Sequence, residues 1–243
     1  MTGGFQNKLL YYIGGRPSDG KSAALNGFAL SAVKSGYRPG IITVESSANE
    51  ILSRTASSAS GVPLTKIKAG TLTPAQISYL IESGTELNDI DPVVYDEPNA
   101  TLQTVCTQAR RMVSVYGCKI LFIDYVQQIT PDVKGVVRNE QIADISKALK
   151  SLARSLDVPI VSAAQLRRPK DAGKHNRPII DDFGDSSQLE KDADGAGLLH
   201  HGIDSDSGNA YSFLHWDKNR DGDTKSIPVF FNKEIVRFEE KNV

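Results

Sequence analysis

The chain has 243 residues, of which 40% are hydrophobic and 23% are charged, and its formal net charge is −1. This length suits one sizeable α/β core and is short for two full domains. The near-neutral charge excludes a uniformly basic nucleic-acid coat, and no apolar run approaches the ~20 residues of a membrane helix. Cys106 and Cys118 fit neither a disulfide framework nor a zinc pattern, and no secretory signal precedes them, so we expect free buried thiols in a cytoplasmic protein.

Predicted strands and helices alternate through the first two thirds of the chain. Short apolar runs predict strands at 8–14, 40–45, 92–96, 119–124 and 158–164. Helical spacing of apolar residues predicts helices at 21–36, 47–61, 73–87, 101–117 and 139–157. Ser47 with Glu50 indicates a capping box, and Thr73 followed by Pro74 indicates a helix start.

The last third of the chain is rich in predicted strands with turns between them. They lie at 195–201, 210–219, 225–232 and 234–240. Alternation followed by hairpins favours an α/β fold, in which a mostly parallel, twisted sheet is flanked by helices and carries antiparallel strands toward the C-terminus. We expect residues 1–243 to form a single domain.

The stretch "GGRPSDGKS" at 14–22 matches the P-loop pattern between a predicted strand and a predicted helix. Glycines let successive amides point at phosphate oxygens, and the helix N-terminus adds positive charge. We expect Lys21 to reach the β and γ phosphates and the Ser22 hydroxyl to bind Mg²⁺. The predicted phosphate-binding residues are Gly15, Arg16, Pro17, Ser18, Asp19, Gly20, Lys21 and Ser22.

Two acidic residues end predicted strands. Asp124 closes "ILFID" and is expected beside the loop, where it would hold magnesium or its water. Glu45 closes "IITVE", where the crevice of a parallel sheet opens, and is a candidate to orient an attacking water. A capping or surface glutamate is the alternative for Glu45.

Several stretches together resemble the RecA-like C-terminal motor domain of DnaB-type replicative helicases. They occur in the family's order and cover nearly the whole chain, and the forms "GRPS-x-GK[ST]" and "IDY-x-Q" are more specific than a bare P-loop. The stretches are "TGGFQNKLLYYIGGRPSDGKS", "IITVESS", "ILFIDYVQQI", "NEQIADISKALKSLARSLDVPIVSAAQLRR", "LEKDADGAGLLHH" and "DKNRDGDTKSIPVFF".

The resemblance implies a hexameric ring that binds ATP with Mg²⁺ between subunits and single-stranded DNA in its channel, with a primase or loader as a further partner. Glu45 matches the family's catalytic glutamate, and Gln165 matches the glutamine that senses the γ-phosphate. Lys218 and Arg220 match the basic pair that reaches the neighbouring subunit's site. Because residues two apart on a strand share a face, we expect these two cations to converge. A solvated hairpin tip is the alternative.

Basic residues before and after the predicted strand at 158–164 are candidates for contact with the DNA backbone, which would be independent of sequence and weakened by salt. The alternative is exposed loops without DNA contact. The family's Arg-Glu-Ser-Gly-like stretch is altered here, with Gly184 in place of the arginine and Ser187 in place of the glycine, which removes a cation. The candidates are Arg138, Arg167, Arg168, Lys170, Lys174 and Arg177, with Asp185 as the retained acid.

The sequence begins almost at the first strand of the motor, without the collar domain and linker helix that the resemblance implies. It is either a piece of a longer protein or a compact natural version, such as a phage-type protein, and we expect weaker subunit association. The function expected is an ATP-dependent DNA helicase motor in a bacterial or phage-infected cell. The alternatives are a RecA-like recombinase or clock-type ATPase, and an ATP-dependent assembly scaffold with little turnover.

Overall fold

The computed structural model describes residues 4–87, 91–132, 137–167, 177–184, 187–203, 210–220 and 222–240. Within these ranges nine strands form one sheet in the order β3-β2-β4-β5-β1-β6-β7-β8-β9. The strands are β1 Leu10–Gly15, β2 Pro39–Thr43, β3 Val93–Asp96, β4 Ile120–Asp124, β5 Ile160–Gln165, β6 Gly195–Ile203, β7 Ala210–Asn219, β8 Lys225–Asn232 and β9 Arg237–Glu240.

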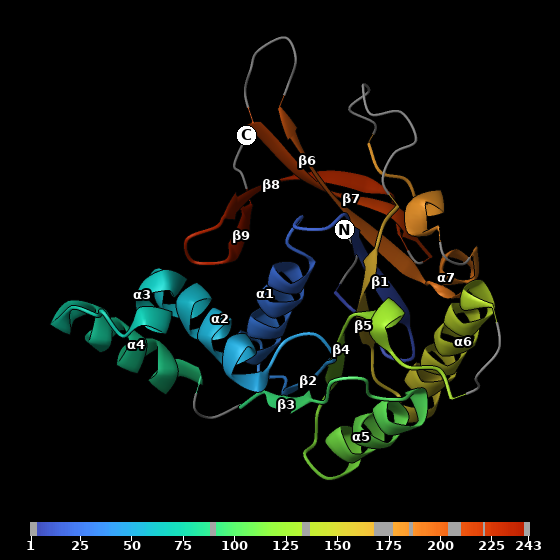
Figure 1. Cartoon of the computed structure of the whole chain (residues 1–243), viewed down its shortest axis with the longest axis horizontal. Coiled ribbons are helices and arrows are strands. Elements are labelled where there is room, and N and C mark those ends of the chain that lie inside the picture. The colour runs from blue at the N-terminus through green and yellow to red at the C-terminus, as the bar shows by residue number, and fades with distance from the viewer. Residues whose placement is uncertain are drawn as a thin grey trace.

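Helices cover both faces of the sheet, with α1 to α4 on one side and α5 to α7 on the other (Figure 1). Two short 3-10 helices, η1 and η2, follow β4 and β5. The bounds are α1 Lys21–Lys34, α2 Ala48–Ser60, α3 Leu64–Ala69, α4 Pro74–Leu87, α5 Leu102–Ser114, η1 Val126–Gln128, α6 Arg138–Leu156, η2 Ile180–Phe183 and α7 Ser187–Asp192.

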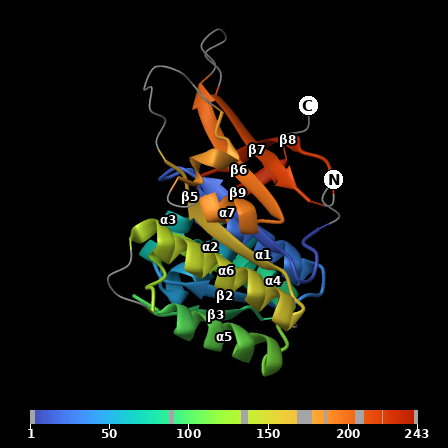
Figure 2. The same ribbon diagram turned by 90° about the vertical axis from the view of Figure 1, so that its right-hand side faces the viewer.

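The type of strand pairing changes once across the sheet. Pairing is parallel from β3 through β6 and antiparallel from β6 through β9. Figure 2 shows β6, β7 and β8 extending beyond the helical layers. Because parallel strands end at one edge, the residues that follow β1, β2, β4 and β5 gather there. The mostly parallel α/β fold with an antiparallel C-terminal part is therefore confirmed.

The core has two layers, because successive strand residues face opposite sides of the sheet. On β1, Leu10 and Tyr12 pack with α5 and α6, while Tyr11 and Ile13 pack with α1. All four side chains are at most 3% exposed. This explains why the central strands read as continuous apolar runs in the sequence.

Both predicted helix starts are confirmed. The Ser47 hydroxyl accepts from Glu50 N at 3.3 Å, and the Glu50 carboxylate accepts from Ser47 N at 3.2 Å. Thr73 makes the same reciprocal pair with Gln76, at 3.3 and 3.1 Å. The short helices α3 and α7 were not predicted, since six residues are too few to show a helical period.

Smaller features fit the sequence-based expectations in part. Both cysteines are free, but only Cys118 is buried, and Cys106 is partly exposed. No helix in the described part of the chain is long and apolar enough to cross a membrane.

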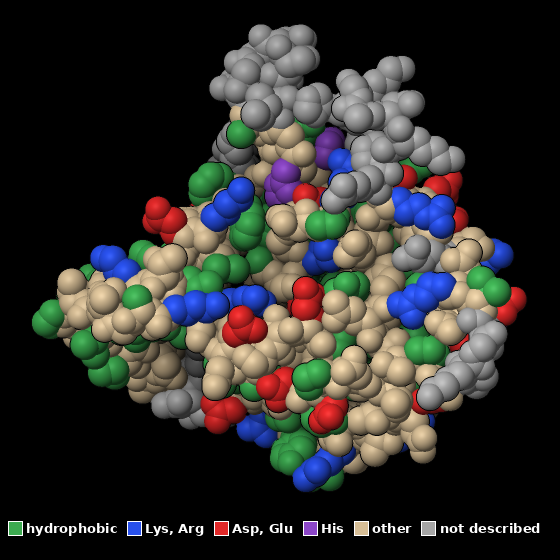
Figure 3. All heavy atoms as spheres, in the orientation of Figure 1, with side chains coloured by type: hydrophobic (Ala, Val, Ile, Leu, Met, Phe, Trp, Pro, Cys, Tyr) green, Lys and Arg blue, Asp and Glu red, His purple; other side chains and the backbone are tan. Residues whose placement is uncertain are grey.

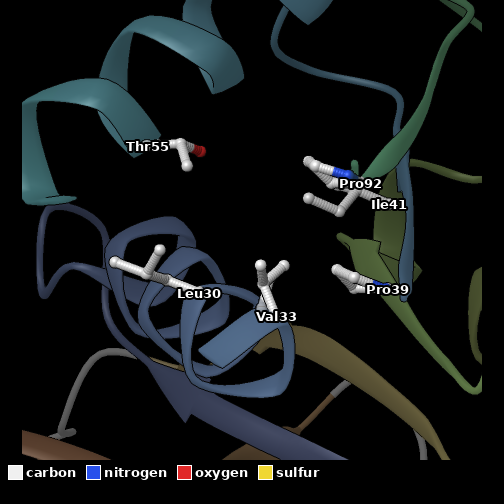
Figure 4. A pocket seen from close by; sticks show the side chains of 7 residues that line it. Leu30, Val33, Pro39, Ile41, Thr55 and Pro92 are labelled. Atoms are coloured by element: carbon white, nitrogen blue, oxygen red, sulfur yellow. The ribbon is translucent and has the colours of Figure 1, made fainter. Parts of the chain in front are cut away.

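A cavity of about 20 Å³ lies between α1, α2 and β2 (Figure 4). It has room for about one water and is lined mainly by aliphatic side chains. Thr55 contributes the hydroxyl of the lining, which lies 2.6 Å from Asn26 Oδ1. The cavity is therefore a packing defect without reactive groups.

Candidate nucleotide-binding site

The phosphate loop between β1 and α1 is held closed by its own hydrogen bonds. Arg16 N donates to the Asp19 carboxylate at 2.7 Å, and Asp19 N donates to Arg16 O at 3.2 Å. Ser18 and Gly20 adopt positive φ angles of 69° and 86°. A Cβ on Gly15 would lie 2.9 Å from the Lys21 Cγ, so this position requires glycine.

The N-terminus of α1 opens into this loop. Gly20 is its N-cap, and no side chain caps the helix. Unpaired N–H groups and the positive end of the helix dipole are therefore available to an anion. Lys21 Nζ donates to Arg16 O at 3.1 Å and lies 6.0 Å from the centre of the Tyr125 ring. Burial lowers the pKa of Lys21, and the neighbouring carboxylates of Asp124, Asp19 and Glu45 partly offset this effect.

Asp124 is the last residue of β4 and is 3% exposed. Neither carboxylate oxygen has a hydrogen-bond partner among the described residues. Burial raises the pKa of Asp124, nearby Ser22 lowers it, and the charge of Glu45 raises it further. An orphaned, buried carboxylate beside a hydroxyl and a phosphate loop suits a hard cation. The site therefore fits Mg²⁺, which is usually held by one or two carboxylates together with substrate phosphates.

Glu45 lies two residues beyond β2 rather than at its end. Thr43 pairs in register with Asp124, and Val44 N donates to Asp124 O at 3.1 Å. Glu45 is exposed, yet it lies close enough to Asp124 and Lys21 to raise the pKa of both. An exposed carboxylate at this edge can accept a proton from a water that approaches the loop.

Gln165 ends β5 directly beside the loop, in register with Gly15. The Gln127 side chain holds this strand end, because its Oε1 accepts from Gln165 N and its Nε2 donates to Gln165 O, both at 3.0 Å. Leu166 N donates to Gly15 O at 3.1 Å. The end of β5 is thus tied to η1 through Gln127 and to the loop through the main chain.

Four residues at or near the site were given no role from the sequence: Arg54, Tyr125, Gln127 and His201. Arg54 of α2 donates to Ser46 Oγ at 3.1 Å, and its charge lowers the pKa of Asp124. His201 Nε2 lies 2.9 Å from Asp19 O. Gln127 and His201 fall in the quoted stretches "ILFIDYVQQI" and "LEKDADGAGLLHH", which offered a signal, whereas Arg54 reaches the site only through tertiary packing.

Lys218 and Arg220 lie at the opposite edge of the sheet from the phosphate loop, because β7 runs antiparallel to β6. Within this chain the two cations bind different partners, and their convergence on a neighbouring subunit's site stays a prediction. Lys218 Nζ donates to Glu190 O in α7 at 2.7 Å, whereas Arg220 pairs with Asp194 at 3.2 Å. The two differ because Arg220 lies one residue past the end of β7 and has left the strand geometry.

Asp194 is the centre of a compact ion cluster at that edge. Its side chain is 1% exposed and accepts from Leu10 N at 2.8 Å. The Lys150 ammonium pairs with it, and Arg220 contributes a second cation whose side chain is 68% exposed. Asp194 is fully partnered, and Arg220 is its solvent-facing partner.

Three of the candidate DNA-contact residues are described, and all three are exposed: Arg138, Arg167 and Arg177. Arg138 begins α6 and donates to Gln127 O, and Arg177 pairs with Asp217 at 2.6 Å. On the face shown in Figure 3, basic and acidic side chains are interspersed. The other candidates lie outside the described residues: Arg168, Lys170, Lys174 and Asp185.

The Arg167 side chain lies against Gly184. A Cβ on Gly184 would overlap the Cγ, Cδ and Nε atoms of Arg167. Gly184 also has a φ of 47° and lies at the end of η2. The glycine that replaces an expected arginine thus makes room for an arginine from the end of β5.

A family model described as the DnaB-like helicase C terminal domain matches residues 1–240. The chain belongs to this family. The replicative DNA helicase DnaB of Treponema pallidum (strain Nichols) is 33% identical over 239 residues, which is 98% of this chain and 53% of that protein. The chain spans about half the length of the curated relatives it matches.

Solved structures of DnaB-like proteins share the fold. The ATPase domain of G40P has a TM-score of 0.89 and 26% identity, covering 98% of this chain and 86% of that one. A DnaB-like replicative helicase, solved in a study of its interactions with primase, has a TM-score of 0.86 and 26% identity, covering 96% of this chain and 57% of that one. The predicted RecA-like core is therefore confirmed.

Proposed function

We propose that this chain is the ATP-hydrolysing motor of a DnaB-like DNA helicase, and that residues 1–243 work as one motor domain. The observation that carries the proposal is the meeting of Lys21 and Ser22 with the buried, unpartnered carboxylate of Asp124. A phosphate loop alone binds an anion. A loop that faces an orphaned carboxylate suits an anion that arrives with a divalent cation, which is the form of ATP in cells.

Each residue then has a distinct task. The amides of residues 15–22 and the Lys21 ammonium hold the phosphates, while Ser22 and Asp124 hold Mg²⁺, which neutralises phosphate charge. Glu45 orients the attacking water and takes its proton. Gln165, fixed beside Gly15, responds to the terminal phosphate.

Lys218 and Arg220 are too far from their own loop to take part there, since they lie at the opposite edge of the sheet. We place them in the site of an adjacent copy, in a homo-oligomer whose closed form is a hexameric ring. The exposure of the Arg220 side chain supports this. An arginine supplied from a neighbour contributes about 10³–10⁵ in turnover in related phosphoryl-transfer enzymes.

The substrate proposed for translocation is single-stranded DNA. Arg167 follows Gln165 by two residues, so a change at the terminal phosphate has a short path to a cation at the surface. Arg138, Arg177 and the basic residues of 168–174 would add contacts that weaken with salt. Because a structural relative was studied with primase, we also propose a primase or loader as partner, acting with this protein in the cytoplasm.

ATP turnover measured with and without single-stranded DNA, together with unwinding of a forked duplex, tests this function. DNA should stimulate turnover, and unwinding should require ATP. Filaments on DNA without unwinding would favour a recombinase. ATP-dependent assembly without stimulated turnover would favour a scaffold.

Mixed assemblies test whether catalysis is shared between subunits. Glu45→Ala and Arg220→Ala should each abolish turnover alone, and mixing them should restore part of it at interfaces that combine an intact Glu45 with an intact Arg220. Full turnover by a strictly monomeric wild-type chain would contradict the arrangement.

A further inference from the structure

His201 of β6 contacts the phosphate loop from outside. Its Nε2 lies 2.9 Å from the main-chain oxygen of Asp19, and its Nδ1 lies 2.7 Å from the hydroxyl of Ser212, its register partner on β7. The ring stacks on Phe238 with centroids 6.0 Å apart and planes 25° apart. The imidazole is therefore fixed by two polar contacts and one aromatic face.

The direction of each hydrogen bond follows from the partners. A main-chain oxygen can only accept, so Nε2 must carry the proton and donate to Asp19. In the neutral ring Nδ1 then accepts from the Ser212 hydroxyl, which is able to donate. The Asp19 oxygen thus fixes the tautomer, and Ser212 supports it by donating to Nδ1.

This contact orients the next amide. In a trans peptide the C=O and N–H of one unit point in opposite directions. With the Asp19 oxygen drawn toward His201, the Gly20 amide hydrogen points away from β6. Gly20 has a φ of 86°, and glycine at such a position rotates at little cost. The peptide plane therefore needs an external restraint to keep one orientation.

Aromatic packing fixes the restraint in place. Phe231 and Phe238 stack with centroids 4.4 Å apart, and a Cβ on Gly20 would lie 3.1 Å from the Phe238 ring. These rings come from β8 and β9, so the antiparallel part of the sheet packs against the phosphate loop. His201, from β6 of the same antiparallel part, adds a hydrogen bond to the main chain of the loop.

We propose that His201 is a positioning residue for phosphate binding: it holds the Asp19–Gly20 peptide so that the Gly20 amide is directed at the phosphates of a bound nucleotide. This rests on the proposed nucleotide site. His201 itself does not touch the nucleotide, and its contribution is to keep one amide donor oriented before the ligand arrives.

Two substitutions separate the hydrogen bond from the packing. His201→Phe keeps an aromatic ring against Phe238 but removes the donor, whereas His201→Gln retains an N–H donor of similar reach. The measurement is the Kd of a non-hydrolysable ATP analogue with Mg²⁺, with the melting temperature recorded in parallel. We expect the Kd of His201→Phe to rise about tenfold and that of His201→Gln to stay within about threefold of wild type, as for loss or retention of one hydrogen bond.

Ser212→Ala removes the hydrogen bond that supports this tautomer and holds the ring, and it should weaken binding by a smaller factor in the same direction. His200→Gln is the matched control, since the His200 ring bonds to Tyr211 and lies 3.4 Å from His215 in a separate cluster. Its Kd should match that of wild type.

Wild-type affinity in His201→Phe with an unchanged melting temperature would overturn the proposal. Equal losses in His201→Phe and His201→Gln would overturn the role of the donor. If His201→Phe fails to fold, unchanged affinity in Ser212→Ala overturns it instead. A wild-type chain that does not bind the analogue would refute the nucleotide site itself, a result distinct from all of these.

Discussion

Asp124 and Asp194 are both almost completely buried, but they differ in whether their carboxylates have partners within the chain. Asp194, at the amino edge of β1, accepts from Leu10 N and pairs with Lys150 and Arg220. Asp124, at the carboxyl edge of β4, has no hydrogen-bond partner among the described residues for either oxygen.

The difference separates a structural carboxylate from a ligand-binding one. Folding rarely leaves a buried polar atom unpaired, so a carboxylate with both oxygens unpaired beside the phosphate loop indicates a partner that arrives later. The partnered aspartate should therefore matter to stability, and the orphaned one to ligand binding. Four predictions test this distinction, from the largest expected effect to the smallest.

Lys21→Ala should lower ATP turnover by about 10²–10³-fold, because it removes the ammonium group that would contact the phosphates of the bound nucleotide. Its melting temperature should change little. Turnover by phosphate release is the measurement, and Lys34→Ala, an exposed cation in the last turn of the same helix, is the control. Normal turnover in Lys21→Ala would refute the site.

Asp194→Asn should lower the free energy of unfolding by about 3–5 kcal/mol, since it leaves Lys150 without its carboxylate in a buried setting. Urea denaturation measures this. Arg220→Gln removes only the exposed cation of the same cluster and should cost less than about 1 kcal/mol. Equal costs for the two substitutions would mean that Arg220, not Lys150, is the main partner of Asp194.

Asp124→Asn should raise the free energy of unfolding by about 1 kcal/mol in the absence of Mg²⁺, because it removes a buried charge whose desolvation outweighs its nearby cations. The same substitution should abolish the stabilisation that Mg²⁺ with an ATP analogue gives the wild type. Thermal unfolding with and without these ligands measures both effects. A destabilised, ligand-free Asp124→Asn would contradict the contrast with Asp194.

The pH dependence should show the smallest effect. Burial raises the pKa of Asp124 in the folded chain above its unfolded value of about 3.9, so the folded state binds this proton more tightly. The contribution of Asp124 to the free energy of unfolding is then largest below about pH 4, and it falls as the pH rises through the folded pKa. Ligand-free wild type should show this decline, and Asp124→Asn should lack it.

The sequence was sufficient where function is local. The loop at 14–22, Asp124 and Gln165 all follow strands that their own apolar runs predict, so their meeting at one edge follows from parallel strand order. Glu45 was predicted to end its strand but lies two residues beyond it, because β2 ends at Thr43.

The sequence was insufficient where contacts join distant segments. His201 lies 182 positions from Asp19, and Gln127 lies 38 from Gln165. No local pattern marks such pairs, since their proximity depends on how β6 and η1 pack beside β1 and β5. The separate partners of Lys218 and Arg220 were not predicted, because the sequence does not show that β7 ends at Asn219, between the two residues.

Strand β1 runs between β5 and β6, so the loop that it carries has a neighbour on each flank. On one flank Gln165 lies next to Gly15 and two residues before Arg167. On the other, His201 bonds to the loop from β6, whose partner β7 carries Lys218 and ends one residue before Arg220. A single displacement at the tip of β1 would thus reach two separate surfaces, the proposed DNA contact at Arg167 and the proposed contact of Lys218 and Arg220 with an adjacent copy, in the same turnover.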